Sequence, residues 1–388
     1  MSLWLLIKLF FLFLYIGLSA LITYLIYNEE KMYYNPLFVR KKSKKEGEAE
    51  ETVSVHDEFD EFAKRDEPIN IIKLFIGILT LFWIRIILDL GIALFHANWL
   101  LNYSKKRNFV LKKEERDYIV SITNFRTKFF LFFAGLFVDF KRLPDEEVLK
   151  VYRKYFGPDY QLDYDGKFCC YISNHTSMYD MALAMAYLGC GFVAKEAVKK
   201  IPIFGTMIVG LHAILVDRGN TTGKKDVLEL IEERQKEYYE GKPVMPFLIF
   251  PEGTTTSARH LITFKKGAFV TSLPIKPTII HPNLKKHYHI GVGASDATLN
   301  YFRSLTEIYN KVEYIELPIM TPNEYMYSNF SNYGKEKWEI YAEVAREIMC
   351  TLGNLKKSDM GIRDSFRYIS CLEEKKLLDR DTYKIKSD

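Results

Sequence analysis

The sequence predicts an α/β fold in which a mixed central sheet is flanked by helices and preceded by N-terminal membrane helices. From about residue 165 onward, short apolar runs rich in β-branched and aromatic residues alternate with longer helical stretches. Near the N-terminus, residues 3–27 contain a single charge, Lys8. Aromatic residues make up 15% of the chain and crowd into phenylalanine-rich runs, which indicates a lipid-facing portion.

Composition sets the broad class of protein. The 388 residues are 48% hydrophobic, enough for a substantial core and roughly two domains. The net charge of +5 is too small to indicate a nucleic-acid partner. The five cysteines are scattered without the spacing of a zinc site or a disulfide framework, so we expect no metal and a reducing compartment.

We interpret residues 1–28 as a transmembrane helix. The apolar run is long enough to cross the roughly 30 Å hydrocarbon layer. A cleaved signal peptide is the alternative, but the run exceeds the usual apolar length and lacks a convincing small-residue cleavage site. Residues 29–69 are charged, poor in apolar residues and free of periodicity, which predicts a flexible linker.

Residues 70–140 are expected to form a membrane-associated or re-entrant helical region. The apolar segment 71–101 is interrupted by Lys73, Arg85 and Asp89, and the last two, four residues apart, are expected to pair on a helix. Residues 129–138 are too few to cross a membrane, so an interfacial or buried segment is expected there. Basic clusters flank the segment 71–101 on both sides, which favours a segment that re-enters or lies flat.

Residues 141–370 are expected to form the α/β domain, and residues 371–388 a polar tail. The expected strands cover residues 167–172, 191–194, 213–217, 246–250, 276–280 and 312–317. Ligands of such sheets gather at the carboxyl ends of strands. Asn174, Asp217 and Glu252 each follow an expected strand, so we expect these three strand ends to converge.

The stretch "YISNHTSMYD" at residues 171–180 places His175 five residues before Asp180. On a regular helix the two side chains would point about 140° apart. With Thr176 or Ser177 as N-cap of a helix ending near Gly189, however, the histidine lies in the preceding turn and the acid can reach back to it.

A carboxylate bonded to one imidazole nitrogen leaves the other free to take a proton from a hydroxyl. Because no Gly-x-Ser-x-Gly motif is present and no cysteine has an evident activating partner, the nucleophile would be an alcohol substrate. The competing interpretation is that His175 and Asp180 merely join a turn to a helix.

Two further motifs suit a phosphate. "FPEGTTTS" at residues 250–257 combines a carboxylate, a glycine and four hydroxyl residues after a strand, as in loops that wrap a phosphate. "ILVDRGN" at 214–220 brings Arg218 to another strand end, where its guanidinium could bind a phosphate in bidentate fashion.

Taken in this order, the motifs resemble the glycerophospholipid acyltransferase superfamily, and within it the membrane-bound 1-acylglycerophospholipid (lysophospholipid) acyltransferases. The resemblance covers about residues 120–370 and includes "FKKGAF" at 264–269 and "AKEAVKKIPIFG" at 194–205. It implies transfer of a fatty acyl group from acyl-CoA to a free hydroxyl of a lysophospholipid. It also implies that His175 is the base, that Asp180 orients it, and that Arg218, Glu252 and Gly253 help to bind the glycerophosphate.

Residue chemistry is compatible with this activity. A thioester is an activated donor, so orienting the alcohol, removing its proton and stabilising one oxyanion would suffice. No cofactor or metal is therefore predicted, and acyl-CoA enters as a co-substrate. The oxyanion donor is either Lys195 or backbone amides near the turn. The predicted substrate-binding residues are Asn174, Lys195, Arg218, Glu252, Gly253 and Thr254, and plausible coenzyme A contacts are Lys199, Lys200, Lys224, Lys225, Lys265 and Lys266.

Alternatives remain for the acceptor and for the class of protein. Glycerol 3-phosphate or lysophosphatidic acid would use the same phosphate contacts, and a non-catalytic lipid-binding membrane scaffold could share the fold. The C-terminal "KIKSD" resembles a dilysine retrieval signal, with Lys384 and Lys386 at the expected distances from the end. The predicted location is the endoplasmic reticulum membrane, with the catalytic domain facing the cytosol.

Overall fold

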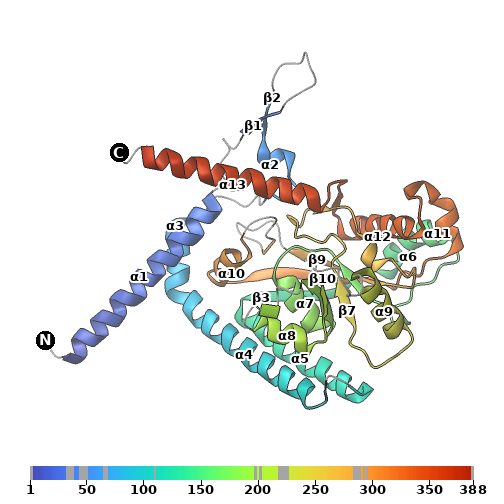
Figure 1. The fold of residues 1–388 in the computed structure, drawn as a ribbon, viewed down its shortest axis with the longest axis horizontal. Helices are drawn as coiled ribbons and strands as arrows, with labels where there is room; N and C mark the ends of the chain where they lie inside the picture. Colours follow the sequence, from blue (N-terminus) through green and yellow to red (C-terminus); the bar gives the residue numbers. More distant parts are fainter. Residues whose placement is uncertain are drawn as a thin grey trace, which may run out of the picture.

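The computed structural model describes residues 3–31, 39–42, 51–63, 69–108, 111–195, 199–200, 203–216, 227–282, 290–291, 293 and 296–385. A seven-stranded sheet lies at the centre, with helices on both faces (Figure 1). Its strands are β3 (Leu136–Arg142), β4 (Tyr171–Ser173), β5 (Gly191–Lys195), β6 (Ile214–Val216), β7 (Phe247–Ile249), β9 (Lys276–Pro282) and β10 (Asn310–Glu316). The expected α/β class with a mixed sheet is confirmed.

The strand order is β3-β10-β9-β4-β7-β5-β6. The β9–β10 pair is antiparallel and the other pairs are parallel. The carboxyl ends of β4, β5, β6, β7 and β9 therefore meet at one edge of the sheet, which is where ligands of open α/β sheets bind.

Two hydrophobic cores lie against the sheet. One contains side chains of α6 (Asp145–Phe156), α9 (Val227–Tyr239) and α12 (Lys337–Gly353). The other contains side chains of α4 (Trp83–Lys105), α5 (Lys113–Phe133), α7 (Tyr179–Tyr187), α8 (Phe204–Gly210) and α10 (Ala297–Leu305). The remaining short elements are β8 (His260–Leu261), β11 (Lys356–Lys357), α11 (Glu324–Asn329) and the 3-10 helices η4 (Lys266–Ala268) and η5 (Ser331–Tyr333).

The N-terminal helix α1 (Leu3–Lys31) extends beyond the α/β body (Figure 1). Its side chains are mostly exposed and apolar, with Phe13 71% exposed. It contacts α3 (Ile71–Gly77) and the π-helix η2 (Ile78–Phe82), and the indole N–H of Trp83 donates to Ser19 Oγ at 3.0 Å. Within the described part of the chain, Leu6–Glu29 and Ile71–Lys105 are the two helical stretches that are long and apolar enough to cross a membrane.

Helix α4 has two different faces. Asp89, His96 and Leu100 are buried against the domain, whereas Ile87 and Phe95 are more than 60% exposed. One side of this helix therefore packs on the domain, whereas the opposite side presents apolar side chains.

Arg85 and Asp89 were expected to pair with each other on the helix. In the structure each of them has a different hydrogen-bond partner. The Arg85 guanidinium donates to the backbone carbonyls of Leu305, Glu307 and Ile308 after α10. Asp89 instead accepts from the Tyr301 hydroxyl at 3.0 Å. Both groups thereby tie α4 to α10.

The segment expected at residues 129–138 is divided between two elements. Helix α5 ends at Phe133, Gly135 adopts a φ of +77°, and β3 begins at Leu136 as an edge strand paired with β10. The left-handed φ at Gly135 explains why the helix stops there and the chain turns into the sheet.

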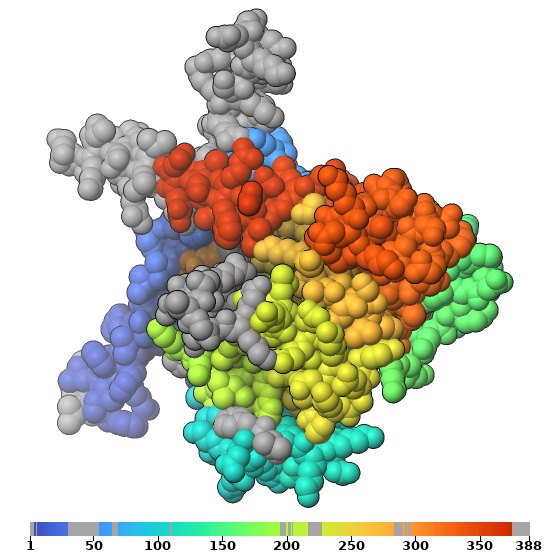
Figure 2. Space-filling view, turned by 45° about the vertical axis from the view of Figure 1, so that its right-hand side comes forward, coloured from blue at the N-terminus to red at the C-terminus, as the bar shows by residue number. Residues whose placement is uncertain are grey.

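Part of the expected linker belongs to the folded structure. After the short β1 (Val39–Lys42) and β2 (Glu51–Ser54) hairpin, α2 (Val55–Glu58) and the following turn pack against the C-terminal helix α13 (Ile362–Ile385). Phe59 and Phe62 are buried there with Ile262 and Tyr368. Figure 2 shows α13 in red beside the gold surface that follows residues 250–257, which are the third motif in chain order after 171–180 and 214–220. Helix α13 also includes residues 371–385 of the expected polar tail.

Candidate active site

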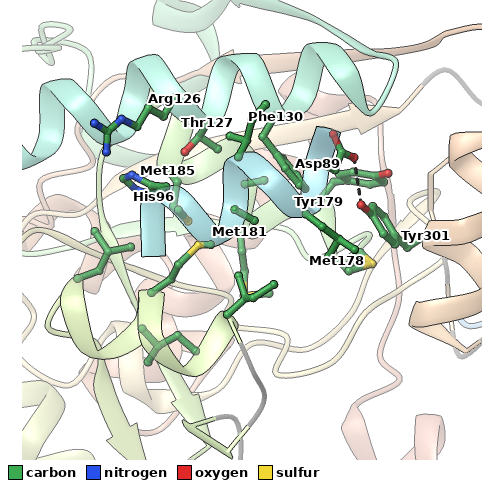
Figure 3. Close-up of a pocket in the computed structure, with 18 of the residues that line it drawn as sticks. Asp89, His96, Arg126, Thr127, Phe130, Met178, Tyr179, Met181, Met185 and Tyr301 are labelled. Carbon is green, nitrogen blue, oxygen red and sulfur yellow. Dashed lines mark hydrogen bonds between the residues drawn. The ribbon is translucent and has the colours of Figure 1, made fainter. Parts of the chain in front are cut away.

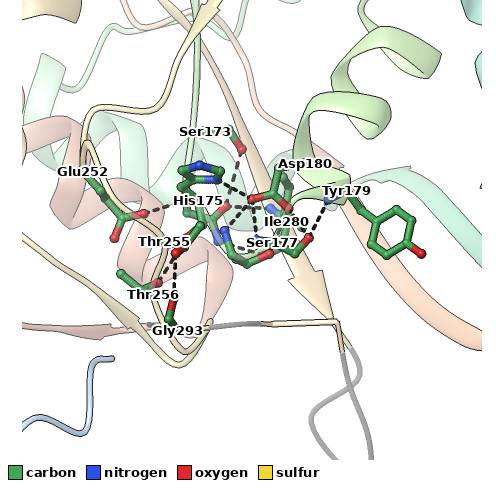
Figure 4. A network of polar contacts seen from close by, with 12 residues as sticks. Ser173, His175, Ser177, Tyr179, Asp180, Glu252, Thr255, Thr256, Ile280 and Gly293 are labelled. Carbon is green, nitrogen blue, oxygen red and sulfur yellow. Dashed lines mark hydrogen bonds and ion pairs between the residues drawn. The ribbon is translucent and has the colours of Figure 1, made fainter. Parts of the chain in front are cut away.

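His175 and Asp180 lie together at the carboxyl end of β4. Nδ1 of the imidazole lies 2.8 Å from Oδ2 of Asp180 (Figure 4). The N-cap is Met178, one to two residues later than the expected Ser177 or Thr176, and α7 begins at Tyr179, so His175 is in the turn and Asp180 in the first turn of α7. This is the reach-back arrangement that the five-residue spacing requires.

The Asp180 carboxylate is fully buried and well supplied with donors. Besides His175, it accepts from the backbone N–H groups of Thr176 and Ser177 and from both of their hydroxyls. These donors stabilise the ionised carboxylate, which compensates for its burial. An ionised acid beside Nδ1 requires that nitrogen to carry the proton, and Nε2 of a neutral ring is then an acceptor.

The imidazole ring has a fixed orientation and remains accessible. It stacks on Phe250, with ring centroids 4.1 Å apart and an angle of 14° between planes. Its side chain is 22% exposed, whereas that of Asp180 is sealed. A fixed, accessible imidazole with a free Nε2 lone pair is suited to take a proton from a hydroxyl.

Asn174 joins two strands. Its amide nitrogen donates to the carbonyl of Ile280 at 2.8 Å, and its Oδ1 accepts from the Ile280 N–H at 2.7 Å. The side chain is buried, so it extends the β4–β9 pairing beyond the last β4 residue. Contact of Asn174 with a substrate stays a prediction, but in this structure the amide serves the strand ends.

Glu252, at the turn after β7, is also buried, and its carboxylate binds two backbone amides. Oε1 accepts from the N–H of His175 at 2.8 Å, and Oε2 accepts from that of Ile262 at 3.2 Å. Burial raises the pKa of Glu252 to about 8, although these two hydrogen bonds act in the opposite direction. In this arrangement Glu252 positions the main chain of the histidine, and a contact with glycerophosphate remains untested.

The rest of the third motif forms a turn beside the histidine. Gly253 has a φ of +72°, a conformation that glycine adopts without steric cost, and its backbone is exposed next to the Lys265 side chain. The hydroxyls of Thr254 and Ser365 lie 3.3 Å apart. The Thr256 N–H donates to the carbonyl of His175 at 2.9 Å, so the motif binds both the N–H and the C=O of the histidine.

Several predicted residues cannot be compared with the structure. Arg218, Asp217, Lys224 and Lys225 lie outside the described residues, as does Lys386. Lys195 ends β5, where its backbone pairs with Val216, but its side chain is not described. Lys199 and Lys200 are exposed, and Lys266 pairs with Glu336 at 3.4 Å.

An apolar cavity of about 340 Å³ adjoins the His175 turn (Figure 3). Its walls come from α4, α5, α7, α8 and α10, and Met178 and Tyr179 bring it within four residues of His175 in the chain. Its volume is in the range of small-molecule sites. Sequence reasoning missed this cavity because its wall is assembled from segments more than 200 residues apart. The usable sequence signal was the pair of Asp89 and His96, seven residues apart within the mostly apolar stretch 86–97.

The structure thus combines an α/β sheet, a His-Asp pair at the carboxyl ends of its strands, and an apolar cavity lined by Met178 and Tyr179 at the start of α7. Residues 159–282, which contain the pair and the third motif, match the Acyltransferase family model. The chain is 31% identical over 202 residues to the lysophospholipid acyltransferase LPEAT1 of Arabidopsis thaliana, covering 52% of this chain and 48% of the relative. It is 29% identical over 173 residues to the human lysophosphatidylcholine acyltransferase 1, covering 44% of this chain and 32% of the relative.

The resemblance inferred from the motifs is therefore confirmed. The chain spans about half or less of the length of these curated relatives. Among solved structures, the 1-acyl-sn-glycerophosphate acyltransferase PlsC from Thermotoga maritima matches with 18% identity and a TM-score of 0.42, covering 70% of this chain and 97% of PlsC.

Proposed function

We propose that this protein is a membrane acyltransferase that moves a fatty acyl group from acyl-CoA to a free hydroxyl of a lysophospholipid, with His175 as general base. The observation that carries the proposal is the 2.8 Å contact between His175 Nδ1 and Asp180, together with an apolar cavity lined by Met178 and Tyr179 of the same segment. The family match over residues 159–282 and the similarity to lysophospholipid acyltransferases support the same activity.

The proposed reaction needs one proton acceptor. Nε2 of His175 takes the proton of the acceptor hydroxyl as its oxygen attacks the thioester carbon. The Asp180 carboxylate stabilises the imidazolium that forms. When the tetrahedral intermediate collapses, the carbon–sulfur bond breaks, and the proton on Nε2 passes to the departing thiolate of coenzyme A. Either Lys195 or backbone amides of the turn would stabilise the oxyanion.

The cysteines give no support for a covalent enzyme intermediate. Burial raises the pKa of Cys350 to about 12 and that of Cys169 well above its usual range. A thiol with such a raised pKa is rarely a thiolate at neutral pH and is a poor nucleophile. Direct attack by the substrate hydroxyl, with its proton removed by His175, fits this chemistry better.

We place the protein at the endoplasmic reticulum membrane with the α/β domain on the cytosolic side, where acyl-CoA is available. The two long apolar helices support membrane association. The exposed aromatic side chains Phe95, Phe125 and Phe129 on α4 and α5 suit a lipid surface next to the cavity. A fatty chain would then enter the apolar cavity from the bilayer.

The alternatives concern the acceptor and the class of protein. Glycerol 3-phosphate and lysophosphatidic acid could occupy the same phosphate contacts. A non-catalytic lipid-binding scaffold is the alternative from another class. The assay is transfer of labelled acyl-CoA to a panel of lysophospholipids, lysophosphatidic acid and glycerol 3-phosphate, in membranes containing the full chain.

The test compares the wild type with two histidine variants. His175→Ala should abolish transfer, whereas His281→Ala, which removes a part-exposed histidine of β9, should retain it. Transfer by the wild type to one acceptor identifies the substrate class. Activity retained by His175→Ala would remove the base assignment, and a folded wild type without transfer to any acceptor would favour the scaffold.

A further inference from the structure

The cavity is not uniformly apolar, because buried polar groups line both of its ends (Figure 3). Asp89 and Tyr301 lie at the end next to Met178 and Tyr179. His96 and Arg126 lie at the opposite end, near Met185. Between Asp89 and His96 the α4 residues that line the cavity are Leu90, Ile92 and Ala93, which are apolar.

His96 is a buried imidazole without a hydrogen-bond partner. Its side chain is 3% exposed, and neither ring nitrogen has a partner within the described part of the chain. The ring is held by stacking on Trp99, with centroids 5.8 Å apart and 21° between planes. A neutral imidazole has one donor and one acceptor, so burying both unused is costly unless a ligand or a water satisfies them.

Arg126 adds further donors at the same end. Its Nη1 atom is buried and also lacks a partner among the described residues. The guanidinium lies over the rings of Phe95 and Trp99, 4.6 and 4.5 Å from their centroids. These cation-π contacts fix the plane of the group but use none of its N–H donors.

The positions of these groups define where a ligand would have to carry an acceptor. On α4, Asp89 and His96 are seven residues apart, and so are Met178 and Met185 on α7, which corresponds to about 10 Å along each helix. The two polar ends are therefore separated by an apolar stretch. A simple hydrocarbon chain would fill that stretch and leave the His96 end unsatisfied.

We propose that the cavity selects a fatty chain that carries a hydroxyl oxygen far from its carboxyl end, and that His96 and Arg126 determine this specificity. The inference rests on the proposed acyl transfer and names the chain class that the site prefers. The hydroxyl accepts from Arg126 Nη1 and exchanges a hydrogen bond with the imidazole. The oxygenated chain belongs to either the acyl-CoA donor or the lysophospholipid acceptor, since both bring a fatty chain to this turn.

The experiment compares chains of equal length in two arms. In the first, palmitoyl-CoA is compared with hydroxypalmitoyl-CoA donors that carry the hydroxyl next to the thioester, at mid-chain or at the terminal carbon. In the second, palmitoyl-CoA is the donor and the same chains are placed on the lysophospholipid. Binding of palmitate and the three hydroxypalmitates to the full chain in detergent is measured alongside.

We expect a mid-chain or terminal hydroxyl to raise kcat/KM about 10-fold over palmitoyl in one arm and to tighten binding similarly. His96→Leu and Arg126→Met should each reduce this preference several-fold, measured as the ratio of kcat/KM for the hydroxypalmitoyl chain to kcat/KM for palmitoyl. Because His96→Leu removes unsatisfied buried polar atoms, it should not lower the melting temperature. Asn98→Leu, an exposed substitution two residues away on α4, and Met185→Leu, an apolar change in the same end of the cavity, are the controls and should keep the wild-type preference.

Equal use and equal binding of plain and hydroxylated chains by the wild type would overturn the inference while leaving acyl transfer intact. A preference that survives in both His96→Leu and Arg126→Met would overturn the assignment of these two residues. If no chain were transferred at all, the proposed function would fail. The binding comparison would still decide whether the cavity prefers a hydroxylated chain.

Discussion

The backbone N–H of His175 donates to Oε1 of Glu252 at 2.8 Å, and both side chains lie at neighbouring strand ends. The second carboxylate oxygen of Glu252 accepts from Ile262, so one buried acid fixes two loops. The third motif thereby holds the main chain of the first. Activity and stability are coupled through this contact, and the coupling has a measurable pH dependence.

Glu252 should make the folded state less stable as the pH rises. Burial raises its pKa from 4.5 to about 8, so the folded state binds this proton more tightly than the unfolded chain. Stability from this group is fully present below pH 4.5 and is lost as the pH rises through about 8. The melting temperature of the detergent-solubilised protein should therefore fall across this range.

The matched variant is Glu252→Gln. Its amide nitrogen cannot accept from the Ile262 N–H, so we expect an overall loss of about 1 kcal/mol of stability. The difference in melting temperature between wild type and variant should nevertheless shrink as the pH rises, because glutamine does not titrate. A constant difference from about pH 5 to pH 8 would show that Glu252 does not titrate in this range.

Asp180→Asn should reduce kcat/KM by roughly 10³-fold. His175 Nδ1 and the backbone N–H groups of Thr176 and Ser177 all meet Oδ2, so an asparagine keeps its oxygen there and turns its N–H₂ group toward the two hydroxyls, which can accept. The neutral amide then no longer stabilises the imidazolium that forms when Nε2 takes the proton of the acceptor hydroxyl. The loss is measured as initial rates of acyl transfer at saturating donor.

Asp139→Asn is the control for this change, because Asp139 is a part-exposed acid of β3 that lies 3.9 Å from Lys311. It should keep wild-type rates. If Asp180→Asn retained more than about a tenth of the activity, the pair would serve only to join the turn to α7, as the competing interpretation from the sequence holds.

Asn174→Ala should destabilise the domain by about 3 kcal/mol, because it leaves the N–H and C=O of Ile280 buried without their partners. Thermal unfolding measures this loss, and Asn329→Ala, on the exposed face of α11, should change stability little. The KM for the acceptor separates the two roles of Asn174. A raised KM with unchanged stability would favour the substrate contact predicted from the sequence.

The sequence predicted those parts of the site that depend on local geometry. The spacing of His175 and Asp180, with hydroxyl residues between them, was enough to place one in a turn and the other on a helix. The roles of Asn174 and Glu252 were harder to anticipate, because their partners, Ile280, Ile262 and the His175 amide, belong to other strands and loops. A motif identifies such polar residues without showing whether they face a ligand or the protein's own backbone.

The difference between local and distant contacts also explains which elements of the fold could be predicted from the sequence. Buried strands such as β7 and β9 were predicted from continuous apolar runs, whereas β3 was missed. Phe137 and Phe140 are largely exposed on this edge strand and follow a phenylalanine-rich helix without a polar break. The folded part of residues 55–63 was missed because its aromatic residues are few and lie among acids. Their burial depends on α13, which lies about 300 residues later.

Docking of residues 55–63 should support both stability and catalysis. Phe59 is 1% exposed, and the Ser257 N–H donates to the carbonyl of Glu61 at 2.7 Å, next to the Thr256 amide that binds His175. Phe59→Ala should cost about 3 kcal/mol through the cavity that it creates. It should also lower kcat by loosening the third motif.

Phe366→Ala, which removes a 52% exposed ring from α13, should stay within about 0.5 kcal/mol of the wild type. Thermal unfolding and acyl-transfer rates measure both effects. An unchanged melting temperature for Phe59→Ala would mean that residues 55–63 are not docked in solution, whereas a lowered melting temperature with unchanged kcat would limit their role to stability.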